Sequence, residues 1–436
     1  MYRWAGAPYL FLAGLLAATR LGPILRGIPR HAWLDLALLG VAAGAWLQVV
    51  PLPQAWLTSL APRAAEVVAE VSLRPPADGP APVSVQQQSG IWAAALLSAN
   101  ILTFLAVRAL FAHGGVRAAV RMVAYLGIVF ASLGLAQAAS GSGAVYWWWE
   151  PYGEGADPFA TFINRNHFAT WVIMAIPACF GYAVARLFLA AGSPPSSHWT
   201  TRVVALIDGR ALLLLFAAIL MTVALLVDLS RSGIVGLACA GLFFVLSGGR
   251  RVERRRRSWL VGALATAALV ALFFADSDAL VRRLTQTVAT DQGRVAIWRE
   301  TLPVVRDFWL TGTGAGTYET AMLVYQRSDR VVSFNQAHNQ YLQIAAEGGL
   351  LLSIPATLAL VAFVGLARRR LMQDRSAVFW IRLGAAAGLV AVMVQNVWET
   401  GLRMPANAAL AAALAAIVVH APRHGGEAED GAAARI

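Results

Sequence analysis

Long apolar runs are the feature of this sequence that most limits its fold. A helix needs about 20 mainly apolar residues to cross roughly 30 Å of hydrocarbon, and eleven segments of this 436-residue chain approach that length and composition. A spanning segment must satisfy its own backbone polar groups, which a helix does. The predicted spans are 4–20, 32–50, 91–111, 120–139, 168–190, 211–228, 232–247, 259–275, 349–367, 379–397 and 405–420.

The composition agrees with this interpretation. Hydrophobic residues make up 58% of the chain and charged residues 13%, against roughly 45–50% and 25% in ordinary soluble domains. So few charges could not cover the surface of a soluble enzyme of this size, and so much apolar surface excludes a disordered chain. We therefore predict an all-α polytopic integral membrane protein with about 11–12 transmembrane helices. Residues 1–420 would form a single transmembrane helical domain, and 421–436 a disordered cytoplasmic tail.

The basic residues indicate an orientation in the lipid bilayer. The net charge is +12 and no lysine is present, and the arginines are densest at 249–257 and 368–382. Cytoplasmic loops carry the basic excess in membrane proteins, so we expect both segments on the cytoplasmic side and no binding of nucleic acid. Alternation of the spans then puts 51–90, 140–167 and 276–341 on the outer face.

The longest of these outer segments, 276–341, has helical periodicity of its own. The pattern appears at 295–307 and again at 318–325, and a glycine-rich turn at 311–316 separates the two. We predict a partly helical loop, inserted between transmembrane helices, that carries part of the functional site.

Four polar side chains come from separate outer segments and are predicted to share one membrane face: Arg165, Arg231, Arg294 and His338. Arg231 is the most informative, because it interrupts an apolar stretch at a turn of six residues, 228–233. A cation there costs about 2.5–3.5 kcal/mol if it lies deep in the bilayer, so it needs an anion. That anion is a bound ligand, a lipid headgroup or the nearby Asp228.

The other arginine candidates lie at the N-termini of predicted helices. Asn164 and Arg165 precede the span at 168–190, and a helix N-terminus attracts anions through its free N–H groups and its dipole. Arg294 begins a helix whose apolar face includes Trp298. Each feature also has a purely structural interpretation, as a helix cap or as a cation that points toward protein.

His338, with Asn339 and Tyr341, precedes the ninth predicted span. A histidine at such a position can serve as a general base, although a single histidine can equally be a structural hydrogen-bonding residue. Nearby arginines would lower its pKa and keep it neutral, which suits a base. Glu347 lies nine residues further on, too far along a helix for direct contact, and we interpret 347–349 as a helix irregularity. Asp276 and Asp278 do not by themselves indicate a metal site, and we expect no metal.

In chain order, several motifs resemble the O-antigen ligase / O-antigen polymerase family of bacterial membrane proteins. The resemblance covers roughly 160–366 and rests on an ordered set of segments rather than on any single motif. The segments are Thr161–Ala169, Leu229–Gly233, Gly293–Arg294 with Trp298, the 311–316 turn, and Ala337–Leu342 continuing to Glu347–Leu350.

This resemblance implies a GT-C-like glycosyltransferase of the bacterial inner membrane whose active site faces the periplasm. Family members need no metal and no cofactor, and they transfer a glycan from undecaprenyl diphosphate to an acceptor hydroxyl. Carried over by position, Arg231 and Arg294 match the diphosphate-binding arginines, Arg165 adds a further contact, and His338 matches the essential histidine. Supporting roles would fall to Asn164, Asn339, Tyr341 and Trp298.

Four functions remain open on the sequence: a ligase, a polymerase, a transporter and a protein O-glycosyltransferase. A ligase would transfer the glycan to lipid A–core, and a polymerase would extend another lipid-linked repeat unit. A transporter of lipid-linked sugars would spread its arginines over both faces and through the membrane depth, whereas the candidates here gather outside. The sequence therefore favours an enzyme, with the ligase first.

Overall fold

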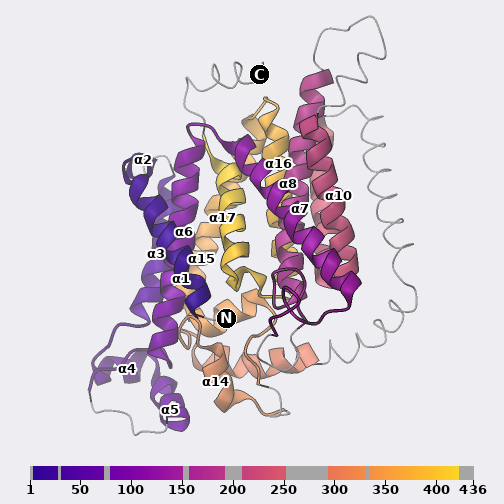
Figure 1. The fold of residues 1–436 in the computed structure, drawn as a ribbon. Coiled ribbons are helices and arrows are strands. Elements are labelled where there is room, and N and C mark those ends of the chain that lie inside the picture. Colours follow the sequence, from indigo (N-terminus) through magenta and orange to yellow (C-terminus); the bar gives the residue numbers. More distant parts are fainter. Residues whose placement is uncertain are drawn as a thin grey trace, which may run out of the picture. The chain divides into compact units, whose positions relative to one another are not determined.

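The computed structural model describes residues 3–27, 31–72, 79–150, 157–191, 209–251, 293–328 and 333–421. Within these ranges the chain is helical, and its β-structure is limited to isolated bridges. Among the described residues, seven helices are long and apolar enough to cross a membrane. They are α6 (Gln87–Phe111), α7 (Val116–Ser140), α8 (Arg165–Ala191), α10 (Gly209–Asp228), α11 (Arg231–Gly248), α15 (Gln340–Gln373) and α16 (Val378–Gln395) (Figure 1).

Shorter helices complete the described chain. Apolar ones coincide with three further predicted spans, namely α1 (Arg3–Thr19), α3 (Ala32–Leu47) and α17 (Pro405–Val419). The others are α2 (Leu21–Gly27), α4 (Gln54–Leu60), α5 (Pro62–Val71), α14 (Tyr318–Tyr325), and the 3-10 turns η2 (Gly249–Arg251) and η3 (Gly401–Arg403). The all-α polytopic membrane fold is thus confirmed. The predicted span 259–275 and most of the tail at 421–436 lie outside the described residues.

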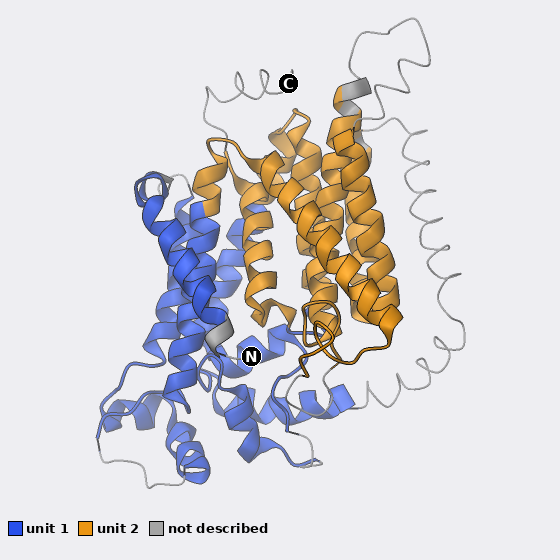
Figure 2. Cartoon of the chain, in the orientation of Figure 1, with its two compact units in different colours: residues 1–106, 281–365, 396–400 blue, residues 107–280, 366–395, 401–436 orange. Residues whose placement is uncertain are grey.

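The chain divides into two compact units, coloured separately in Figure 2. Unit 1 comprises 1–106, 281–365 and 396–400, and unit 2 comprises 107–280, 366–395 and 401–436. Of the predicted outer segments, 51–90 and 281–341 belong to unit 1 and 140–167 belongs to unit 2. Each unit is described by itself below.

Unit 1 contains a hydrophobic core built from its two long outer segments. Residues of α4 and α5 pack with the helix at 293–307 and with α14, and Phe308 and Tyr318 are almost fully buried there. The predicted periodicities at 295–307 and 318–325 are therefore both confirmed as helices. The apolar faces of these short helices are buried against one another, so this part of unit 1 has a hydrophobic core of its own.

A kink in α15 shapes the same unit. Gly349 has φ 52° and ψ −154°, values that interrupt the helix. A Cβ at this position would lie 2.5 Å from the backbone nitrogen of Gly312, so glycine is required both for its conformation and for the close approach. The predicted irregularity at 347–349 is confirmed, and its cause is the packing of the 311–316 turn against the helix.

Unit 2 is a bundle in which α8 packs closely against α16. A Cβ on Gly181 would lie 2.3 Å from the Trp380 carbonyl oxygen, and one on Gly384 would lie 2.3 Å from that of Pro177. Small residues let two membrane helices approach at backbone distance. The middle of α8 is thus packed at backbone distance against α16, and Arg165 is the first residue of α8.

Candidate functional site

His338 occupies a strained position in unit 1, just before α15. Its φ is 47°, in the left-handed region that residues with a side chain seldom adopt. Such a conformation persists only where the neighbouring structure enforces it, and it is frequent at active sites. The Nδ1 atom of His338 is buried and has no hydrogen-bond partner among the described residues. A buried ring nitrogen of this kind is available for a substrate group.

The residues on each side of His338 are held by hydrogen bonds. Ala337 donates its N–H to Oε1 of Gln343 at 2.7 Å, and its carbonyl accepts from Nε1 of Trp298 at 2.9 Å. Oδ1 of Asn339 accepts from the N–H groups of Tyr341 and Leu342, both at 3.0 Å, and so caps α15. The conformation of His338 is thus fixed from both sides.

A second layer of contacts fixes Gln343 itself. Its Nε2 donates to Oε1 of Glu347 at 2.7 Å. Glu347 also accepts from the N–H groups of Gly316 and Tyr318, at 3.0 and 3.2 Å. This carboxylate therefore joins the glycine-rich turn to the start of α15. Glu347 does not act on His338 directly, as predicted; it acts on the segment that carries His338.

Gln48, at the end of α3, completes this polar network. The side chain is fully buried, and its Nε2 donates to the carbonyls of Thr311 at 2.6 Å and Glu347 at 2.8 Å. Its Oε1 accepts from the N–H of Ala315 at 3.0 Å. One amide thus satisfies three buried backbone groups that would otherwise each be costly.

Arg294 lies on the first turn of the helix at 293–307 and faces protein, as its sequence position predicted. Its Nη2 donates to Oε1 of Glu399 at 2.8 Å, and the exposed fractions of the two side chains are 21% and 1%. The segment Asn396–Thr400 carries Glu399 and is bound to the His338 region, because the N–H of Gln340 donates to the Asn396 carbonyl at 2.8 Å.

Electrostatics in this corner keep His338 neutral. Burial and, to a smaller extent, the positive charge of Arg294 together lower the pKa of His338 to about 4. The predicted direction agrees with this result, but the larger cause is burial rather than arginine. An imidazole that stays neutral at physiological pH is able to accept a proton.

Arg165 begins α8 in unit 2 and is part of a closed loop. Its N–H donates to the carbonyl of Asp157 at 2.8 Å, and its Nη1 forms an ion pair with Oδ2 of the same residue at 3.0 Å. Oδ1 of Asn164 accepts from the N–H of Asn166 at 2.8 Å. Asn164 therefore acts as a helix cap, and the Arg165 side chain is oriented by a carboxylate.

Arg231 is the first residue of α11, and the turn before it is shorter than predicted. The helix α10 continues through Asp228, so that only Leu229 and Ser230 connect it to α11. Ser230 is the N-cap, with its Oγ accepting from the N–H of Gly233, while Leu229 takes a positive φ of 56°. The predicted six-residue turn is corrected to two residues, because helical backbone persists to the ends of both spans.

The structure brings the Arg165 and Arg231 segments together within unit 2. Oγ of Ser230 donates to Oδ1 of Asn166 at 3.0 Å. Within unit 1, Arg294 and His338 are likewise neighbours, with Trp298 beside them. The four predicted residues thus form two pairs, one in each unit.

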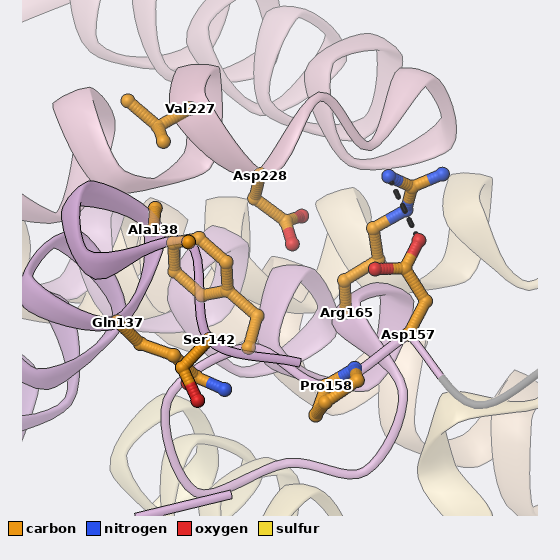
Figure 3. A pocket seen from close by; sticks show the side chains of 10 residues that line it. Gln137, Ala138, Ser142, Asp157, Pro158, Arg165, Val227 and Asp228 are labelled. Carbon is orange, nitrogen blue, oxygen red and sulfur yellow. Dashed lines mark ion pairs between the residues drawn. The ribbon is translucent and has the colours of Figure 1, made fainter. Parts of the chain in front are cut away.

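A pocket of about 190 Å³ lies in unit 2 beside the first residue of α8, and Figure 3 shows Arg165, Asp157 and Asp228 around it. The end of α7, the loop before α8 and the end of α10 all contribute. Its lining consists of Gln137, Ala138, Gly141, Ser142, Asp157, Pro158, Phe159, Arg165, Val227 and Asp228.

Sequence reasoning missed the carboxylate partners of the arginines. Glu399 was a signal that could have been used, because an acidic residue between two apolar spans is costly unless it is paired or functional. Asp157 offered no such signal, since it lies in a polar loop. Gln48 and Gln343 were also missed, because a buried amide cannot be distinguished from an exposed one by sequence pattern alone.

Comparison with known proteins agrees with the motifs. Residues 216–356 match a family model described as O-antigen ligase. A search of curated proteins finds no match to the chain. The matched segment includes Arg231, Arg294 and His338, whereas Arg165 precedes it. Over these residues the chain is similar to the O-antigen ligase family, in agreement with the resemblance seen in its motifs.

Proposed function

We propose that this protein is an inverting, metal-independent glycosyltransferase that transfers a glycan from undecaprenyl diphosphate to an acceptor hydroxyl. It acts at the periplasmic face of the bacterial inner membrane, and its first candidate activity is that of an O-antigen ligase with lipid A–core as the acceptor. The observation that carries the proposal is the His338 corner. A neutral imidazole with an unpartnered, buried Nδ1 is held there next to the Arg294 cation.

The proposed reaction is a single displacement. The acceptor oxygen attacks the anomeric carbon as its proton passes to His338, and the bond from that carbon to the diphosphate oxygen breaks. The leaving diphosphate keeps the electron pair. One displacement inverts the anomeric configuration, and general base catalysis of this kind contributes typically about 10²–10⁴-fold to the rate.

Diphosphate binding is assigned to Arg294, beside His338, and Arg231 is kept as a separate candidate of unit 2 on the resemblance alone. Guanidinium groups bind phosphate oxygens in a bidentate manner and stabilise charge as it develops, which removes the need for a metal ion in this step. The Arg294–Glu399 contact uses one terminal nitrogen, whereas a guanidinium has five N–H donors. Arg165, predicted as a third phosphate contact, likewise uses one terminal nitrogen in its ion pair with Asp157, and its phosphate role stays a prediction.

The test uses purified protein in nanodiscs with polyprenyl-diphosphate-linked repeat units, analysed on a gel with and without lipid A–core. A single mobility shift that requires lipid A–core identifies a ligase. A ladder formed from the donor alone identifies the alternative, a polymerase of O-antigen or exopolysaccharide. The absence of any covalent product with a matched donor contradicts the proposal and favours transport of the lipid-linked sugar.

A further inference from the structure

The helix at 293–307 has a second face that the core of unit 1 does not cover. On its inner side, Val304 and the following Phe308 belong to that core and are almost fully buried. The residues on the opposite side, which we call the exposed stripe, are Val295, Arg299, Leu302, Arg306 and Trp309. At about 100° per residue, the four of them that lie within the helix fall in an arc of about 60°.

The exposed stripe presents aligned apolar side chains. Leu302 and Trp309 are 57% and 58% exposed, and Val295 is 37% exposed. Single apolar residues are common on protein surfaces and need no explanation, but these three are each seven residues apart, so they lie along one line of the helix. An apolar line with arginines beside it is typical of a helix that lies in the interface between lipid and water.

The charge of the exposed stripe suits anionic headgroups. Arg299 is exposed, and the Arg306 side chain is 80% exposed with only its Nε in contact with Asp307. The two carboxylates of the helix are directed elsewhere, because Asp307 is 12% exposed and Glu300 accepts from the N–H groups of 327–328. The stripe itself therefore carries two cations and no anion. Long basic side chains can keep the charge among headgroups while their stems cover apolar surface.

The exposed stripe also continues the apolar surface of a spanning helix. The N–H of Leu350 donates to the Trp309 carbonyl at 2.8 Å, directly after the kink in α15. From there α15 exposes a row of apolar side chains, Leu350, Ile354, Leu358 and Val361. In Figure 1 the helix at 293–307 crosses the direction of α15 rather than continuing it. Trp309 thus lies where the lipid-facing row begins, and tryptophan is enriched at that level of membrane proteins.

We infer that the exposed stripe rests on the surface of the bilayer, with its apolar side chains at the headgroup boundary and its two arginines on the phosphates of anionic phospholipids. The helix at 293–307 then lies in the plane of the membrane surface. Its first turn carries Arg294, so the same contact holds Arg294 at the depth where a membrane-anchored diphosphate is presented. This consequence for the donor rests on the proposed function, whereas the contact with lipid does not.

Electron paramagnetic resonance tests the lipid contact without requiring transfer. The full-length protein, with Cys179→Ala and Cys239→Ala, carries one nitroxide label in nanodiscs that contain phosphatidylglycerol. Leu302→Cys places the label on the exposed stripe, and Glu319→Cys is the matched control, because it is an exposed position of α14 in the same unit. We expect the ratio of collisions with a water-soluble nickel chelate to collisions with oxygen to be several-fold lower at position 302 than at position 319.

The role of the arginines is tested in the same way. Arg299→Gln/Arg306→Gln should raise the ratio at position 302, and neutral phosphatidylcholine in place of phosphatidylglycerol should raise it in the parent protein. Both arginines are exposed, so the fold should be retained, and thermal unfolding checks this. An unchanged ratio in both experiments overturns the contact with anionic headgroups.

Two results at position 302 would overturn the lipid contact itself. A ratio equal to that at position 319 would show that the stripe faces water. Shielding from both the chelate and oxygen would show that protein, such as a second copy of this chain, covers it. Failure of the proposed function is a separate result, because a protein with an immersed label that forms no covalent product would retain the lipid contact and lose the enzymatic assignment.

Discussion

The two units each hold an arginine–carboxylate pair of similar length in very different surroundings. Arg294 and Glu399 meet at 2.8 Å with a carboxylate that is 1% exposed, whereas Arg165 and Asp157 meet at 3.0 Å with a carboxylate that is 57% exposed. Exposed pairs contribute about 0–1 kcal/mol, while breaking a buried pair costs about 3–5 kcal/mol because a charge is left without compensation. Hydrogen-bond length therefore does not rank the two pairs, and burial does.

The difference extends to the groups around each pair. In unit 1, side-chain hydrogen bonds fix the residue before His338 and the cap that follows it, and the catalytic candidate is kept neutral. In unit 2, the Arg165 pair borders an open pocket. Unit 1 thus holds its pair within a network of buried side-chain contacts, whereas unit 2 holds its pair beside a pocket.

The largest effect is expected from His338→Ala, which removes the proposed base from the rigid corner. Turnover should fall by about 10²–10⁴-fold, while the dissociation constant of the donor stays close to the wild-type value. His338→Asn is the control for folding, because asparagine tolerates a positive φ better than most residues. Wild-type turnover in the His338→Ala protein would exclude the base role.

The second-largest effect is expected from Arg294→Ala, which removes the guanidinium that is paired with the buried Glu399 carboxylate. We expect a loss of about 3–5 kcal/mol in the free energy of unfolding, together with weaker donor binding. The double variant Arg294→Ala/Glu399→Gln separates the two effects, since it should recover much of the stability and none of the donor affinity. Full recovery of both would make the pair purely structural.

Glu347→Gln tests whether the network behind His338 matters for the chemistry. The neutral amide is a weaker acceptor for the Gly316 and Tyr318 N–H groups, so unfolding should become easier by about 1–3 kcal/mol. We expect kcat to fall more than KM rises, since the donor arginines are untouched. Thermal unfolding and steady-state kinetics, with Glu319→Gln as an exposed control on α14, decide the point. An unchanged kcat would confine Glu347 to folding.

The pH profile gives a further distinction. With a pKa of about 4, His338 remains neutral down to mildly acidic pH, and kcat/KM should decline only as the pH falls toward 4. If His338 had the ordinary histidine pKa near 6.5, kcat/KM would already be about tenfold lower at one pH unit below that value. The sign for stability is the same: protons bind the unfolded state first, so stability falls as the pH decreases from about 6.5 to 4. A profile centred near 6.5 would contradict the buried environment.

The smallest effect on stability is expected from Arg165→Ala. The exposed pair with Asp157 should contribute no more than about 1 kcal/mol, measured by chemical unfolding beside Arg294→Ala. A loss as large as that of Arg294→Ala would remove the distinction between the two corners.

Much of this organisation was predictable from sequence, and the reason is physical. Apolar length predicts spanning helices because the bilayer imposes it, and the helices at 293–307 and 318–325 follow from their periodicity. Arg231, Arg294 and His338 could be selected as candidates because polar groups are costly beside apolar spans. Glu399 and Gln343 were not, because their contacts join segments that are distant in sequence or that depend on a kink at Gly349. The extent of a turn such as 229–230 also depends on capping by Ser230, which pattern alone does not measure.

The left-handed backbone at His338 has an evolutionary consequence. Glycine adopts this conformation without the cost that a side chain brings, so His338→Gly would relieve strain at the very residue whose imidazole the proposed reaction needs. Selection for stability and selection for activity then favour different residues at position 338. A stability-driven search for improved variants would tend to remove the histidine.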